Sequence, residues 1–239
     1  MKINIEEGCK RLQSKDKWDE ATVEVAKTAR DLGGFIARYV GGPLGQACGI
    51  VEDKLKYMRW ERQIRLMQRA EEFLAERRLD KPTRAVPLPF IIPLLQAGSL
   101  EEDDSLQDRW ALLLVNAADA DSQTEARKAF ISILEDLTPL DALILEKIYS
   151  LPCGNEPDAD IYPEIHTTFL PDRVTFEVPE QDKERPPLDC EVSLGNLARL
   201  GLISAVKTWG GMTSFKIVYR TRLGWEFIRA VSRPAYSPL

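Results

Sequence analysis

The chain has 239 residues, of which 44% are hydrophobic, so it is long enough to bury a sizeable core in one domain or two. Its net charge of −6 at pH 7 argues against a protein that coats nucleic acid electrostatically, although a local basic patch is compatible with that charge. The four cysteines lie far apart, and the longest uncharged run, residues 85–100, is short and holds three prolines, so we expect a cytoplasmic protein with no cofactor, no metal and no stable membrane span.

The first part of the chain, residues 1–137, has the pattern of a helical domain. Residues 16–31 place apolar side chains at helical intervals and predict an amphipathic helix that ends at Gly33-Gly34. The stretch that follows, residues 32–51, is rich in glycine and alanine. Such a composition indicates either helices packed closely through small residues or a region that contacts a membrane.

A long helix is predicted from Pro43, a residue favoured at the first helical position, to about Arg78. Arginines recur along it at intervals of three or four residues and form a basic stripe. This stripe is either a solvated face, neutralised by acids of the same helix, or a surface that binds phosphates or an acidic partner. The stripe consists of Arg59, Arg62, Arg65 and Arg69.

A central helix is predicted to begin at Ser99, because Ser99 and Glu102 have the spacing of a capping box. Apolar residues surround this helix on nearly all sides, so we expect Trp110 and Leu114 to be buried in the core. A short apolar helix over roughly residues 89–97 precedes it. Another helix, over residues 124–137, follows it and should bury Ala129, Ile133 and Leu137.

The second part, residues 138–239, begins with the helix start signal Thr138-Pro139. Residues 152–188 form a proline-rich acidic excursion, with a strand expected at 173–178. After it come a short helix that ends at Gly201, two strands at 203–207 and 215–219, and a closing helix at 221–231. The predicted fold is therefore mainly α, with an N-terminal multi-helix bundle and a C-terminal winged-helix-like α+β unit.

The end of the chain is basic within an acidic protein, because residues 189–239 hold seven bases and three acids. A winged helix offers a helix to a nucleic-acid groove and a hairpin to the backbone. Winged helices also serve as packing or protein-binding modules. The candidate residues for binding nucleic acid or a partner are Arg199, Lys207, Trp209, Lys216, Arg220 and Arg222, together with the basic stripe.

No catalytic constellation is found in the sequence. His166 is the only histidine, so a Ser-His-Asp or Cys-His mechanism would have to use it. It lies in the proline-rich excursion, where a structurally incidental role is expected. We therefore expect a protein that is not an enzyme.

Four segments together resemble the Abi-alpha family of bacterial abortive-infection proteins: residues 86–119, 130–151, 193–203 and 219–230. The similarity covers roughly residues 42–151 and 193–231. It implies a role in defence against phage without implying a reaction or catalytic residues. The hypotheses that follow are binding of a protein partner or nucleic acid through the winged-helix-like unit, a membrane-acting effector that uses residues 32–51, and a helical scaffold that binds a protein or a second copy of the chain.

Overall fold

The computed structural model describes residues 32–40, 60–122, 124–152, 163–178, 185–207, 211 and 213–233. It divides into two compact units, Met1–Tyr57 and Met58–Leu239. In the first unit residues 32–40 are helical, so the prediction that Gly33-Gly34 end a helix is wrong. The predicted helix at residues 16–31 and the start of the long helix lie outside the described residues. None of the helices described is long and apolar enough to cross a membrane.

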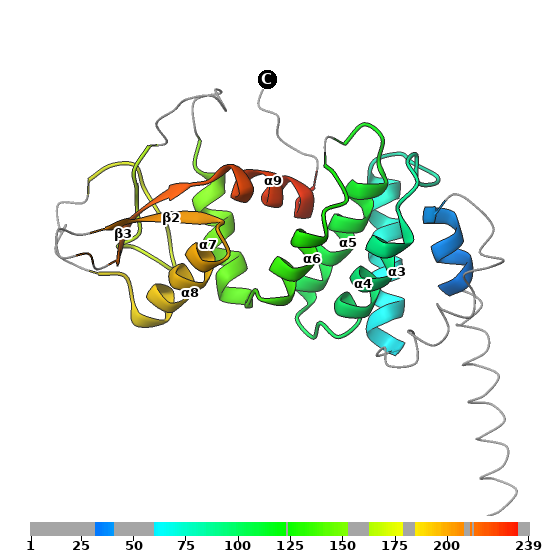
Figure 1. Cartoon of the computed structure of the whole chain (residues 1–239), viewed down its shortest axis with the longest axis horizontal. Coiled ribbons are helices and arrows are strands. Elements are labelled where there is room, and N and C mark those ends of the chain that lie inside the picture. Colours follow the sequence, from blue (N-terminus) through cyan, green and yellow to red (C-terminus); the bar gives the residue numbers. More distant parts are fainter. Residues whose placement is uncertain are drawn as a thin grey trace, which may run out of the picture. The chain divides into compact units, whose positions relative to one another are not determined.

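The second unit is built on a group of helices with α5 at its centre (Figure 1). The helices are α3 (Trp60–Glu76), α4 (Leu88–Gly98), α5 (Asp104–Ala118) and α6 (Lys128–Glu135). Helix α5 packs against α3 and α4 and also against two helices from later in the chain. Trp110 and Leu114 are buried, which confirms the prediction that this helix forms the core.

Helix α5 begins four residues later than predicted. Ser99 is the C-cap of α4, and its backbone N–H donates to the carbonyl oxygen of Leu95. Its backbone is helical, whereas the N-cap residue of a helix is extended, so Ser99 does not cap α5. Asp103 is extended and is the true N-cap: its Oδ1 accepts hydrogen bonds from the N–H groups of Ser105 and Leu106 at 2.9 and 3.0 Å. The predicted capping box at Ser99 is therefore wrong.

The flanking helices follow the predictions in part. Helix α4 agrees with the predicted residues 89–97 to within one residue at each end. Helix α6 is shorter than predicted, and Ala129 is exposed while its neighbour Phe130 is buried. Ile133 and Leu137 are buried as expected.

The remaining elements are α7 (Pro139–Ser150), β1 (Ile165–His166), α8 (Leu188–Arg199), β2 (Ile203–Lys207), β3 (Thr213–Arg220) and α9 (Arg222–Val231). Helix α7 starts where the sequence predicts, with a capping box in which the Thr138 N–H donates to Asp141 Oδ2 at 2.8 Å and the Asp141 N–H donates to Thr138 Oγ1 at 3.2 Å. The protein is therefore mainly α with a small α+β part, as predicted.

The strands form one antiparallel sheet in the order β1-β3-β2, with Ile165 opposite Val218 and Ala205 also opposite Val218. The strand predicted at residues 173–178 is wrong. Within that range only Thr175 pairs with a strand, through an isolated bridge to His166. In the part of the excursion that the structure describes, the strand is instead β1.

Helix α9 lies against α5 and is fixed there by one buried amide. The two N–H groups of the Asn116 side chain are shared among three carbonyl oxygens at the end of α9, at 3.2, 2.7 and 3.0 Å; these belong to Arg229, Ala230 and Ser232. Such carbonyls have no partner within the helix, so the amide satisfies them. The predicted boundary between residues 137 and 138 thus falls inside a single compact unit.

Candidate binding surfaces

The basic stripe of α3 faces α5 and is matched by acids there. Arg62 and Arg65 both pair with Asp104. Arg69 makes a two-point contact with Asp108, from Nε to Oδ1 at 2.9 Å and from Nη2 to Oδ2 at 2.7 Å, and these bonds raise the pKa of the Arg69 guanidinium. These arginines therefore join two helices of the core, while Arg59 lies outside the described residues.

Arg220, a candidate binding residue, lies inside the core with only 1% of its surface exposed. Its Nε and Nη2 donate to the carbonyl oxygen of Ile148 at 2.9 and 2.6 Å, and Nη2 also donates to that of Leu151 at 2.6 Å. These carbonyls belong to the last turn and the C-cap of α7. The guanidinium also lies 5.6, 5.8 and 5.1 Å from the ring centres of Tyr149, Phe176 and Trp225. Arg220 thus holds the end of α7 and is not part of the surface.

The other candidates that the structure describes in this part of the chain lie at or near the surface. Lys207 is exposed at the end of β2, and Lys216 is half-buried on β3. Arg222 is exposed at the start of α9, and Trp209 lies outside the described residues. Arg199, in the last turn of α8, pairs with Asp136 at 2.9 Å.

The outer face of α8 is a surface that the sequence pattern does not predict. Leu188 and Val192 are 76% and 68% exposed, and with Gly195 and Arg199 they follow one line along the helix at helical spacing. We call these four residues the outer stripe. The opposite face of α8 is buried through Cys190, Leu194 and Leu197.

The first half of α8 is not predicted, because the sequence pattern gives only a short helix that ends at Gly201 and assigns residues 152–188 to the proline-rich excursion. The signal that could have found the start is Pro187 followed by Asp189 and Glu191, since helix first turns favour proline and acids. The outer stripe is thus apolar in its first half, at Leu188 and Val192. Acidic side chains lie beside it at the N-terminal end of α8, and Arg199 lies at the C-terminal end.

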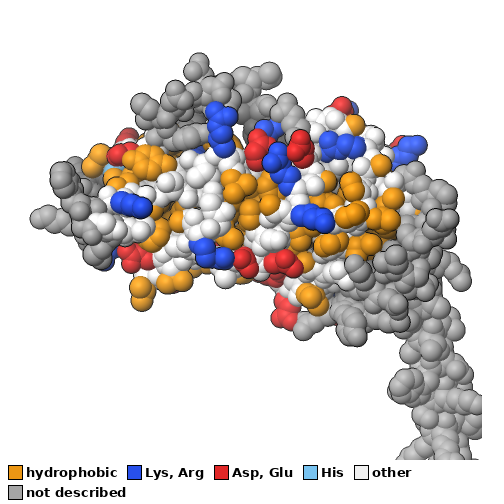
Figure 2. Space-filling model, in the orientation of Figure 1, with side chains coloured by type: hydrophobic (Ala, Val, Ile, Leu, Met, Phe, Trp, Pro, Cys, Tyr) orange, Lys and Arg blue, Asp and Glu red, His pale blue; other side chains and the backbone are white. Residues whose placement is uncertain are grey.

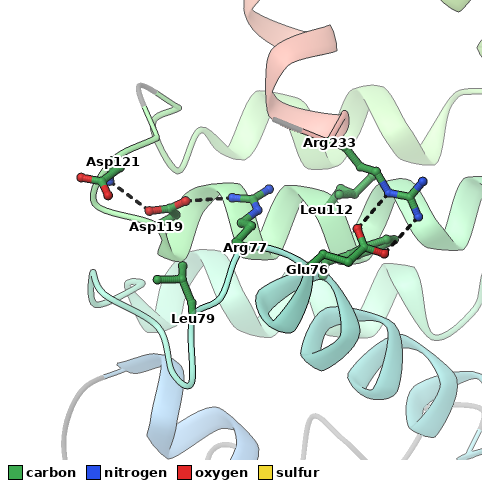
Figure 3. Close-up of a pocket in the computed structure, with 8 residues that line it drawn as sticks. Glu76, Arg77, Leu79, Leu112, Asp119, Asp121 and Arg233 are labelled. Carbon is green, nitrogen blue, oxygen red and sulfur yellow. Dashed lines mark hydrogen bonds and ion pairs between the residues drawn. The ribbon is translucent and has the colours of Figure 1, made fainter. Parts of the chain in front are cut away.

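A pocket of about 420 Å³ lies where the ends of α3 and α5 meet Arg233, two residues beyond the end of α9 (Figure 3). Two ion pairs line it: Arg77 Nη1 to Asp119 Oδ2 at 3.0 Å, and Arg233 Nε to Glu76 Oε2 at 3.1 Å. Leu79 and Leu112 add apolar surface. Each guanidinium already has a carboxylate from the chain itself, so the lining does not single out one class of ligand.

His166 lies in β1 and is buried. The His166 N–H donates to the Thr175 carbonyl oxygen at 2.8 Å, and the Thr175 N–H donates to the His166 carbonyl oxygen at 3.2 Å. The residue therefore belongs to the sheet. Across the residues that the structure describes, no three histidine, cysteine, aspartate or glutamate side chains are grouped so that they could hold a metal ion.

Comparison with known proteins places the chain in a family. The family model described as abortive infection alpha matches residues 61–231, which is more than half of the chain. The matched region runs from α3 to the end of α9 and so includes the paired arginines, buried Arg220 and the outer stripe. No curated protein and no solved structure is significantly similar. The chain belongs to the abortive infection alpha family.

Proposed function

We propose that the chain is a non-enzymatic phage-defence protein that acts by binding a protein partner through its C-terminal α+β part. Membership of the abortive infection alpha family suggests the setting, which is defence of a bacterium against phage. Cys190 is a free, buried thiol, which suits a reducing cytoplasm.

The order of elements supports a winged-helix-like unit. Helix α7 leads to β1, α8 precedes the hairpin of β2 and β3, and β3 lies between the other two strands. In such a unit the helix before the hairpin is the one that contacts a partner, and the hairpin is the wing. Helix α8 would therefore carry the contact surface.

The observation that favours a protein partner is the character of that helix. Its outer stripe exposes Leu188 and Val192, and α8 carries two acids and one base in all. A helix that enters a nucleic-acid groove needs positive charge near the phosphates. Exposed apolar side chains in a row instead mark a surface for another protein. Figure 2 shows lysine and arginine side chains spread over one face of the molecule between acidic and hydrophobic ones.

Nucleic-acid binding through the hairpin is the second candidate, and the observation that favours it is the excess of bases in residues 189–239. Lys207 and Lys216 would provide phosphate contacts, and binding to DNA or RNA would then weaken as salt rises. The membrane-effector hypothesis depends on residues 32–51, of which only residues 32–40 are described.

A phage challenge distinguishes the two candidates. Bacteria that express the protein with its neighbouring genes are infected with a panel of phages, and plaques are counted. We expect Leu188→Ser/Val192→Ser to lose protection and Lys207→Glu/Lys216→Glu to keep it. Leu100→Ser is the matched control, because Leu100 is also exposed but lies at the turn after α4. Protection lost only in the lysine variant would favour nucleic acid and contradict the proposal.

A further inference from the structure

We infer that the partner bound by the outer stripe of α8 is a second copy of this chain, with the two α8 helices antiparallel. This inference rests on the proposed function, in which that stripe is the contact surface. Four features of α8 carry it: the spacing of the stripe, the glycine within it, the charges at its ends and the exposure of Arg199.

The spacing is symmetric about the centre of the stripe. Residues 188, 192, 195 and 199 are separated by four, three and four positions. When two such helices cross antiparallel about a two-fold axis, Leu188 of one copy faces Arg199 of the other, and Val192 faces Gly195. Each residue of the stripe then meets another residue of the stripe, as a self-complementary interface requires. This alternation of three and four is also the spacing of helices that pack knobs into holes.

Gly195 has no evident role within the chain itself. A Cβ placed on it would meet only the ring of Phe215, at 3.8 and 3.9 Å, which is ordinary contact. Glycine in the middle of a helix is about 0.5–1 kcal/mol less favourable than alanine. The fold thus has room for a side chain at a position that lacks one. In the antiparallel pair the missing side chain leaves a hole for Val192 of the second copy.

The charges favour the antiparallel direction. Asp189 and Glu191 lie in the first turn of α8, and Arg199 lies in the last turn. The antiparallel arrangement brings Arg199 of one copy to the acidic end of the other, where its aliphatic stem can cover Leu188 while the guanidinium reaches an acid. A parallel arrangement would place like charges together.

Arg199 is exposed enough to pair with an acid of the second copy. Its ion-pair partner is Asp136, and the two side chains are 59% and 49% exposed. Arg199 also donates from Nε and Nη2 to Asn196 Oδ1, at 3.1 and 2.8 Å, within α8 itself. Exposed ion pairs of this kind contribute little to stability, so replacing Asp136 by an acid of the second copy costs little. The contact is made by one 12-residue helix from each copy and is smaller than the roughly 800 Å² per partner of a standard stable interface. We therefore expect a weak dimer whose population rises with protein concentration.

The first test is sedimentation velocity of the full chain over a concentration series. We expect the wild type to shift from monomer to dimer. The variant Leu188→Ser/Val192→Ser should self-associate at least about tenfold more weakly, a change of about 1.4 kcal/mol. Gly195→Leu, which fills the hole, should weaken the dimer in the same way, and Leu100→Ser should not. Thermal unfolding of each variant checks that it is folded.

The second test reverses the charges at the two ends of α8 in separate variants and then mixes the variants. Recovery of the dimer in the mixture is expected only for the antiparallel arrangement. Asp189→Arg/Glu191→Arg and Arg199→Glu should each weaken the homodimer, because like charges then face each other. An equal mixture of the two should form a heterodimer, because each copy again meets opposite charge. A folding defect in either variant cannot produce this rescue.

The outcomes separate this inference from the proposed function. A wild-type chain that stays monomeric at every concentration, or a dimer that none of the stripe variants weakens, overturns the inference. If Leu188→Ser/Val192→Ser still loses phage protection in that case, the proposed function stands and the partner is a different protein. If Leu188→Ser/Val192→Ser also keeps phage protection, both the dimer inference and the proposed function are wrong.

Discussion

Arg220 on β3 donates two hydrogen bonds to the carbonyl oxygen of Ile148, which lies in the last turn of α7. The same strand pairs with both β1 and β2, and α8 packs against α7. One buried guanidinium therefore ties the sheet to the helix on which α8 rests. This contact keeps α8 in place with its outer stripe directed away from the core.

Replacing Arg220 should strongly destabilise the C-terminal part. Arg220→Met would leave the carbonyl groups of Ile148 and Leu151 without the donors that now satisfy them, and we expect a loss of about 3 kcal/mol. The matched control is Arg222→Met, two residues along, where the side chain is exposed. Urea unfolding of both variants measures the difference. Equal stabilities would contradict the structural role given to Arg220.

Gly224, in the first turn of α9, should tolerate no side chain. A Cβ there would lie 1.8 Å from the Tyr149 hydroxyl and 2.2 Å from the backbone oxygen of Leu202. The backbone atom cannot move aside cheaply, so Gly224→Ala should cost more than about 3 kcal/mol or abolish folding. Gly195→Ala provides the comparison, because its Cβ meets only ordinary contacts. Thermal unfolding at low protein concentration should show little loss, or a small gain, for Gly195→Ala.

Asp103, the cap of α5, should stabilise the protein in a pH-dependent way. Hydrogen bonds, chiefly that from the Ser105 hydroxyl, lower the pKa of the Asp103 carboxyl. A carboxyl whose pKa is lower in the folded state adds stability that is complete above its unfolded value of about 3.9 and disappears as the pH falls through the folded value.

Asp103→Ala should therefore cost about 1 kcal/mol at pH 7 and progressively less in acid. Ser99→Ala, at the position where the sequence pattern predicts the cap, should show no such pH dependence, because the Ser99 hydroxyl is not ionisable and donates to the Gln96 carbonyl oxygen. Unfolding curves at several pH values test both variants. A larger, pH-dependent loss for Ser99→Ala would reverse the assignment of the cap.

Trp110 is the largest fully buried side chain of α5. Truncation to alanine should destabilise by about 3 kcal/mol or more, because it removes apolar contacts and leaves a cavity. Differential scanning calorimetry should show a clear fall in melting temperature. An unchanged melting temperature would mean that α5 is not the centre of the core.

The parts of the fold that could be predicted from the sequence are those with local signals. The start of α7 is one, because Thr138, Pro139 and Asp141 lie within four residues and act through the first turn alone. The hairpin of β2 and β3 and the closing helix are others. Family membership was also predicted, from segments in which such packing and capping residues recur.

The parts that could not be predicted depend on residues far apart in the sequence. The arginines of α3 and the acids of α5 are each visible as runs of charge, but their pairing across about 40 positions is a property of the packed helices. The burial of Arg220 requires rings from three separate segments. The outer stripe was not predicted for a different reason: the sequence pattern predicts only a short helix that ends at Gly201, and Leu188 falls in the proline-rich excursion.

The central claim is that contact between two copies of α8 is needed for defence, and co-expression of the two charge variants tests it most directly. Bacteria carrying Asp189→Arg/Glu191→Arg alone, Arg199→Glu alone, or both together are challenged with a phage that the wild type resists. We expect each variant alone to lose protection and the two together to restore it. Full protection by each variant alone, or no restoration by two folded variants together, would contradict it.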